Sequence, residues 1–153
     1  MMITTNDLHN MAQQGATMNI HLTNDDLLPT LIVSTEDNQL GIYGISGSKD
    51  EISHLVLHKL QESNAKAYAF VVEAWATTFY EEVKKYDRVR DMPLDDRYEM
   101  VQIVLVEKDK GVVGGSNAKI NRSGTHAKTL GPWENISNSE DVKVVSDYYI
   151  TEW

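Results

Sequence analysis

The 153-residue chain contains no cysteine, and this absence excludes several kinds of chemistry at once. Without thiols the protein can form no disulfide, thiolate zinc site or iron–sulfur cluster, and it has no cysteine nucleophile. The chain also lacks an apolar run of the roughly 18 residues that a membrane-spanning helix needs. No basic segment followed by an apolar one, the pattern of a signal peptide, precedes Met18. These absences predict a cytoplasmic protein without a membrane segment.

Basic residues are outnumbered, with 14 Lys and Arg against 23 Asp and Glu, and the net charge is −9. Such an acidic protein is repelled by phosphate backbones, so we expect no general nucleic-acid binding. The acidic residues are spread along the chain, which favours solubility as their role over the alternative, mimicry of DNA. The chain is 41% hydrophobic, and we expect residues 1–153 to form one domain.

Two helices are predicted from hydrophobic periodicity and capping residues. A short helix is expected over Thr5–Gln14, ended by Gly15, with few apolar side chains and therefore a place at an edge of the fold. A long amphipathic helix is expected over Lys49–Ser63, because Ser48 and Glu51 have the spacing of a capping box. Four residues form the predicted apolar side of this second helix: Ile52, Leu55, Val56 and Leu60.

Strand patterns fill most of the remaining chain. They predict a hairpin, two long strands and a final strand, over Leu27–Ser34 with Leu40–Ile45, Ala65–Thr78, Tyr98–Lys108 and Val142–Trp153. Both faces of the Ala65–Thr78 strand are apolar, which indicates a central position in the sheet. The glycines between residues 111 and 131 indicate further short strands and turns. The order of the elements predicts an α+β fold with a mainly antiparallel sheet.

Sequence motifs for catalysis or cofactor binding are sparse. There is no Gly-x-Ser-x-Gly motif of a serine hydrolase, and Gly111–Lys119 lacks the Gly-Lys-Ser/Thr end of a phosphate loop, so it reads as a turn or hairpin. His54 and His58 lie four residues apart on the polar side of the predicted long helix. Two imidazoles at that spacing can share a metal ion, although a solvated helix face explains them more simply. We therefore expect no cofactor and keep a metal site as an alternative.

The most unusual residue is Glu73, a carboxylate within an apolar predicted strand. Burial would raise its pKa and suit it to general acid–base catalysis, but an ion pair with Arg88 or Arg97 explains it more simply. If the next strand returns antiparallel, Glu73, Trp75, Arg97 and Glu99 share one end of the sheet. An aromatic ring beside mixed charges occurs both in small-ligand sites and at sealed strand ends.

Two motifs carry a resemblance to known sequences. Glu73-Ala74-Trp75 ends a predicted strand, and a charged excursion leads to Pro93-Leu94-Asp95-Asp96-Arg97-Tyr98-Glu99 before the next strand. This arrangement resembles a group of small, functionally uncharacterised bacterial and phage proteins, with the second motif shortened here. Since that group has no activity that can be named, the resemblance implies no function and points again to the same residues.

Three hypotheses follow from the sequence. The first is a non-enzymatic binding or accessory domain that can self-associate through an edge strand, with a partner that the sequence does not identify. The second is a small hydrolase that uses Glu73 as general acid or base beside Arg97. The third is a metal-dependent variant that adds a further ligand to His54 and His58. We favour the first, because no catalytic constellation is complete.

Overall fold

The computed structural model describes residues 2–22, 27–76, 82, 85–86, 91–123, 127–136 and 149–153. Within these ranges lie two α-helices, a short 3-10 helix and seven strands. In chain order these are α1 (Thr5–Leu22), β1 (Thr30–Thr35), β2 (Leu40–Gly44), α2 (Lys49–Glu62), β3 (Ala65–Ala76), η2 (Leu94–Asp96), β4 (Tyr98–Glu107), β5 (Gly111–Ser123), β6 (Ala127–Leu130) and β7 (Glu134–Asn135). Arg88, most of the charged excursion and residues 142–148 of the expected final strand lie outside the described residues.

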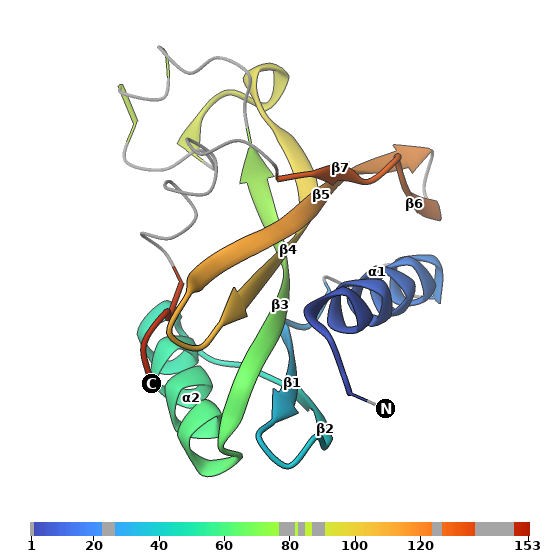
Figure 1. The fold of residues 1–153 in the computed structure, drawn as a ribbon. Coiled ribbons are helices and arrows are strands. Elements are labelled where there is room, and N and C mark those ends of the chain that lie inside the picture. The colour runs from blue at the N-terminus through green and yellow to red at the C-terminus, as the bar shows by residue number, and fades with distance from the viewer. Residues whose placement is uncertain are drawn as a thin grey trace.

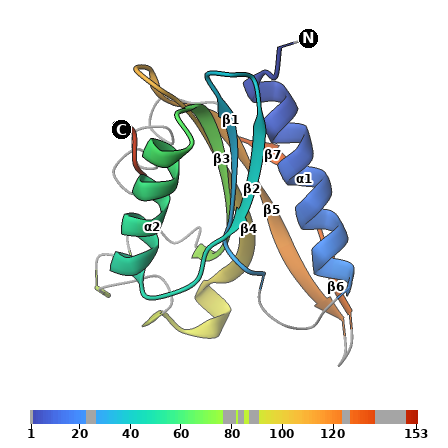
Figure 2. The same ribbon diagram turned by 90° about the horizontal axis from the view of Figure 1, so that it is seen from below.

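The strands form one antiparallel sheet in the order β2-β1-β3-β4-β5-β6, and β7 pairs with β5. The sheet is strongly twisted, and α1 and α2 lie on its opposite faces (Figures 1 and 2). The predicted α+β class, the first hairpin and the central position of β3 are therefore confirmed. Gly111–Lys119 belongs to β5 and forms a hairpin with β4, one of the two predicted alternatives. The expectation of short strands here is wrong, because β5 is a single strand of 13 residues.

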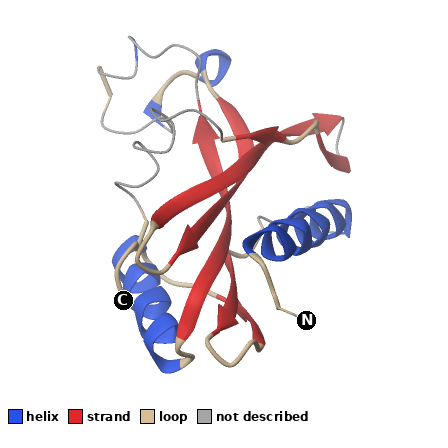
Figure 3. Cartoon of the chain, in the orientation of Figure 1, coloured by secondary structure: helices blue, strands red, loops and turns tan. Residues whose placement is uncertain are grey.

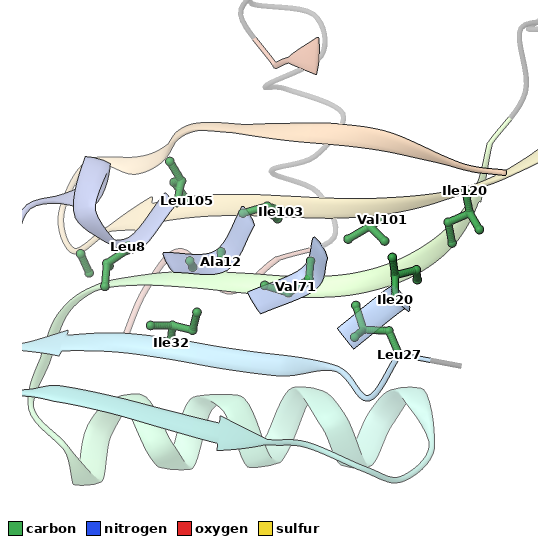
Figure 4. Packing of buried hydrophobic residues seen from close by; sticks show 13 residues of the cluster. Leu8, Ala12, Ile20, Leu27, Ile32, Val71, Val101, Ile103, Leu105 and Ile120 are labelled. Carbon is green, nitrogen blue, oxygen red and sulfur yellow. The ribbon is translucent and has the colours of Figure 1, made fainter. Parts of the chain in front are cut away.

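The N-terminal helix is longer than the sequence predicted, because α1 continues through Gly15 to Leu22. Its inward residues follow a spacing of four and pack on the centre of the sheet rather than on an edge (Figure 4). These residues are Leu8, Ala12, Ala16 and Ile20. Glycine in a helix interior costs about 1 kcal/mol, and the burial of Ala16 and Ile20 outweighs that cost.

The sequence predicts Thr5 or Asn6 as the N-cap of α1, and this prediction is wrong, because Thr4 caps the helix. Thr4 Oγ1 accepts a hydrogen bond from the Asp7 N–H at 3.1 Å, and the Thr4 N–H donates to Asp7 Oδ2 at 2.8 Å. This is the reciprocal pattern of a capping box. The second helix is capped as predicted, since Ser48 accepts a hydrogen bond from the Glu51 N–H.

The second helix is the shorter of the two, and its apolar side is narrower than expected. Val56 and Leu60 are buried and Ile52 packs against them, whereas Leu55 is exposed and faces solvent. The inward side chains thus repeat every four residues, and Leu55 falls beyond that stripe. The expectation of one long amphipathic helix is not confirmed.

The C-terminal residues complete the α2 side of the sheet. Residues 149–153 form no strand, although the sequence predicted one there. Instead, the Tyr149 hydroxyl donates to Gln102 Oε1 at 2.8 Å and the Trp153 indole N–H donates to the Ala65 carbonyl at 2.8 Å. The Tyr68 hydroxyl donates to the Ile150 carbonyl. Side-chain hydrogen bonds hold this segment in place of ladder pairing. Figure 3 draws its backbone as a loop.

Membrane insertion through a helix has no support in the described ranges. Neither α1 nor α2 has the combination of length and apolar character that would let it span a bilayer.

Candidate functional site

The structure brings the four predicted site residues to one end of the β3–β4 pair. Trp75 and Glu99 are register partners, and Glu73 pairs with Val101 two residues further along. Because alternate residues of a strand share a face, Glu73 and Trp75 lie on the α1 side, in line with Ala69 and Val71. The guanidinium carbon of Arg97 lies 4.0 Å from the centre of the Trp75 ring, within the range of a cation–π contact.

The carboxylate of Glu73 is engaged by groups of the protein itself. Its Oε1 atom accepts a hydrogen bond from the Leu27 N–H at 2.8 Å and lies 4.0 Å from the Lys128 Nζ. The side chains of Lys128 and Glu73 are 2% and 16% exposed. A buried carboxylate is stable when it is paired and hydrogen-bonded. The structure thus supplies, from β6, a cation that the sequence did not connect with Glu73.

The outer part of this cluster is also an ion pair. Arg122 donates to Glu99 Oε2 through Nε at 3.0 Å and through Nη2 at 2.7 Å. Arg122 is about half exposed, with 47% of its side chain open to solvent. Both carboxylates of the predicted cluster therefore face protein cations. This arrangement seals a strand end more readily than it activates a substrate, since a general acid or base needs access to a reacting atom.

The two histidines considered as metal ligands lie on the solvent side of α2. His58 Nε2 is 2.8 Å from Glu62 Oε2, and the His58 side chain is 68% exposed. His54 is exposed as well. Within the described part of the chain, no group of three His, Cys, Asp or Glu side chains is close enough to hold a metal ion.

A partly buried polar cluster under α1 was not predicted from the sequence. His9 Nε2 lies 2.7 Å from Ser116 Oγ, and Gln13 Nε2 is 3.1 Å from both of these atoms. Burial lowers the pKa of His9. The pairing resembles a nucleophile and its base, but Ser116 is completely buried and no substrate can reach its hydroxyl. The cluster satisfies polar groups between α1 and β5.

An open pocket of about 530 Å³ lies beside the β4–β5 turn. It is bordered by Lys108, Asp109, Lys110, Gly111, Thr151, Glu152 and Trp153. Its charged side chains include both signs, and Lys110 already lies 3.3 Å from Glu107. The charges of this pocket therefore favour no particular class of ligand.

The outer edge of β2 differs from the clusters and the pocket described above, because its backbone groups pair with no other strand among the described residues. In the described part of the chain, β2 pairs with β1 alone and ends the strand order. Seen from below, β2 lies in front, with α1 and α2 on either side (Figure 2). An open strand edge presents unpaired N–H and C=O groups that can bind another strand.

The backbone hydrogen bonds at the two ends of the β1–β2 pair establish which residues of β2 direct their N–H and C=O groups outward. The Thr35 N–H donates to the Gln39 carbonyl at 2.9 Å, and the Ile45 N–H donates to the Pro29 carbonyl at 2.8 Å. Hydrogen-bonded pairs alternate with non-bonded pairs along an antiparallel ladder. Leu40, Ile42 and Gly44 occupy the non-bonded positions, so their N–H and C=O groups face away from β1.

The side chains on this edge are apolar and unusually exposed. Leu40, Ile42 and the adjacent Leu28 are 42%, 58% and 51% exposed. The β2 sequence, Leu-Gly-Ile-Tyr-Gly, contains no charged residue and no proline. Natural sheets protect their edges with charges, prolines or bulges, and β2 has none of these. We refer to β2 with Leu28 as the open edge.

Comparison of the chain with protein-family models, with curated proteins and with solved structures gave no match. The function is therefore argued from the geometry of the chain alone.

Proposed function

We propose that this protein is a non-enzymatic protein-binding domain that takes an extended segment along the open edge. The observation that carries this proposal is the combination of outward backbone groups and exposed apolar side chains at Leu40 and Ile42. Strand addition uses these two features together, because backbone hydrogen bonds supply affinity and alternate side chains supply specificity. The absence of cysteine is compatible with action in the reducing cytoplasm.

Catalysis has weaker support than binding. Glu73 faces Lys128 and the Leu27 N–H, while Glu99 faces Arg122, so neither carboxylate is held ready for a substrate proton. The His54 and His58 pair lacks a third ligand among the described residues. For this reason we propose neither a hydrolase nor a metal-dependent function.

The proposal can be tested with peptides selected from a random library on the immobilised protein. The binding site of each selected peptide would be mapped by backbone amide shifts in NMR spectra. We expect the largest shifts at Leu40, Ile42 and Gly44, whose N–H groups point outward. Peptides that instead shift residues around Trp75 and Arg97, and leave β2 unchanged, would show that the protein binds elsewhere.

Two lysine substitutions provide a matched comparison for this experiment. Ile42→Lys places a charge on the open edge, and Leu94→Lys places the same charge at another exposed leucine, 70% exposed, in η2. Binding should be lost with Ile42→Lys and retained with Leu94→Lys, since lysine on an edge strand opposes strand addition. Equal binding by both variants would contradict the proposal.

A further inference from the structure

We infer that the segment taken by the open edge is β2 of a second copy of this chain, paired antiparallel about a two-fold axis at Ile42. This inference rests on the proposed function, because it names the strand that the edge receives. The two sheets would then form one continuous sheet across the dimer. Such an interface uses the same patch on both copies, as expected of a closed two-fold dimer.

The backbone pattern of β2 suits this register. The outward residues are Leu40, Ile42 and Gly44. With the axis at Ile42, Ile42 faces Ile42 of the second copy, and Leu40 faces Gly44 of the second copy. These are hydrogen-bonded positions of the new ladder, where facing residues exchange both N–H···O bonds. Each outward N–H and C=O of β2 thus gains a partner.

The side chains are self-complementary in the same register. Each large residue other than Ile42 faces a glycine, since Leu40 faces Gly44 and Tyr43 faces Gly41 of the second copy. Leu28 already covers Gly44, because a Cβ added at Gly44 would lie 2.6 Å from Leu28 Cδ2. Leu40 of one copy would therefore pack beside Leu28 of the other. Tyr43 likewise covers Gly41 of its own chain, because a Cβ added at Gly41 would lie 2.8 Å from the Tyr43 hydroxyl oxygen, so the two Tyr43 side chains would lie beside each other. Two large residues are direct register partners only at Ile42.

Charge opposes self-association over most of the molecule, but not along β2. The whole chain carries a net charge of −9, so two copies repel over most of their surfaces. The strand β2 contains no charged residue, and the charged residues nearest to it in the sequence are Asp37 and Glu36, in the β1–β2 turn. Antiparallel pairing places the two turns at opposite ends of the interface, where they stay apart.

Engineered cysteines test this register directly, because the natural chain has no thiol. In the proposed dimer the two Cα atoms at Ile42 would be about 5.5 Å apart, a separation that a disulfide can bridge. The two Cα atoms at Leu40 would be offset by four residues along the strands, roughly 13 Å at the rise of a strand. Mild oxidation should therefore cross-link Ile42→Cys into a covalent dimer and leave Leu40→Cys largely monomeric. Equal cross-linking of both variants, or of neither, would overturn the register.

Sedimentation equilibrium supplies a second readout that needs no cysteine. The unmodified protein should approach twice the 17.3 kDa mass of one chain as its concentration rises. Ile42→Lys should weaken the dimer about tenfold or more, because two lysines would face each other on the axis. Leu94→Lys should dimerise as the unmodified protein does. A dimer that persists in Ile42→Lys would place the interface elsewhere and overturn the inference.

The two proposals fail in different ways. If the unmodified protein is monomeric at all concentrations but library peptides still bind at Leu40 and Ile42, the edge serves another partner and the self-pairing inference is wrong. If the peptides map elsewhere and no cross-link forms at Ile42, both the proposed function and the self-pairing fall together.

Discussion

The open edge and the cluster around Glu73 are two ends of the sheet with opposite properties. We refer to Glu73, Trp75, Arg97, Glu99, Arg122 and Lys128 as the Glu73 cluster. Around Glu73 and Trp75 the sequence places charges and an aromatic ring, and the structure pairs them internally with Lys128, Arg97 and Arg122. Along β2 the side chains carry no charge, yet the backbone groups remain open and the side chains exposed. The charged and aromatic residues around Glu73 thus have partners within the chain, whereas, among the described residues, the outward backbone groups of β2 do not.

This contrast separates the reactivity of a residue from its availability to a binding partner. A buried carboxylate attracts attention because its burial is costly, but the structure reduces that cost by supplying a cation and a backbone donor. An apolar strand of five residues attracts little attention, although its outward N–H and C=O groups can exchange water for another strand. Binding is therefore expected where the backbone is open to a partner.

The largest effect on stability should come from breaking the pair of Glu73 and Lys128 in the Glu73 cluster. Glu73→Gln keeps an oxygen for the Leu27 N–H but leaves the buried Lys128 without its facing charge. We expect the free energy of unfolding to fall by about 3 kcal/mol, measured by urea denaturation. Adding Lys128→Met should recover much of the loss. A change within about 0.5 kcal/mol for Glu73→Gln would match an ordinary surface substitution and show that the pair is unimportant.

Two proline substitutions sharpen the description of the open edge. The Tyr43 N–H faces β1, whereas the Ile42 N–H faces outward. Tyr43→Pro should be about 2 kcal/mol less stable than Tyr43→Ala, because the Leu31 carbonyl loses its partner in the ladder. Ile42→Pro should stay within about 1 kcal/mol of Ile42→Ala, since proline is tolerated where the N–H points away from the sheet. Urea denaturation at low protein concentration measures both, and a reversed order would contradict the orientation of β2.

A smaller effect should appear on acidification, through the half-buried His9. Burial lowers the pKa of His9 below its ordinary value of 6.5, so the folded protein favours the neutral ring more than the unfolded chain does. Stability should therefore be fully present above pH 6.5 and fall as the pH drops below that value. The control is His9→Gln, which should flatten the stability profile in this range. An unchanged profile in His9→Gln would show that another group titrates.

The smallest effect on stability is expected at the solvent-facing side of the Glu73 cluster, where Arg122 pairs with Glu99. Arg122→Ala removes the exposed partner of Glu99, and exposed ion pairs contribute at most about 1 kcal/mol. We expect a loss near 0.5 kcal/mol that shrinks further in high salt. A loss as large as that of Glu73→Gln would mean that the two ion pairs of the cluster have similar weight.

Local pattern predicted much of the fold and part of the cluster. The alternation of β3 and β4 and their antiparallel return explain why Glu73, Trp75, Arg97 and Glu99 could be grouped before the structure was known. Lys128 could not be added, because it belongs to β6 and reaches Glu73 only through the folding of the β5–β6 hairpin over this face of the sheet.

Tertiary packing explains what the sequence did not predict. The extension of α1 past Gly15 depends on burial of Ala16 and Ile20 against the sheet, which no local rule contains. The contact of His9 with Ser116 joins residues 107 positions apart. The open edge could not be predicted for a related reason. The order of the strands in the sheet decides which strand lies outermost, and the sequence of β2 does not contain that information.

The most direct test of the open edge is amide hydrogen exchange in β2 at increasing protein concentration. The N–H groups of Leu40, Ile42 and Gly44 should exchange quickly in dilute protein, while those of Gly41 and Tyr43 are protected by β1. As the concentration rises, Leu40, Ile42 and Gly44 should become protected together. Strong protection of these three amides in protein that sediments as a monomer would mean that the edge is already occupied within one chain. That result would contradict the account.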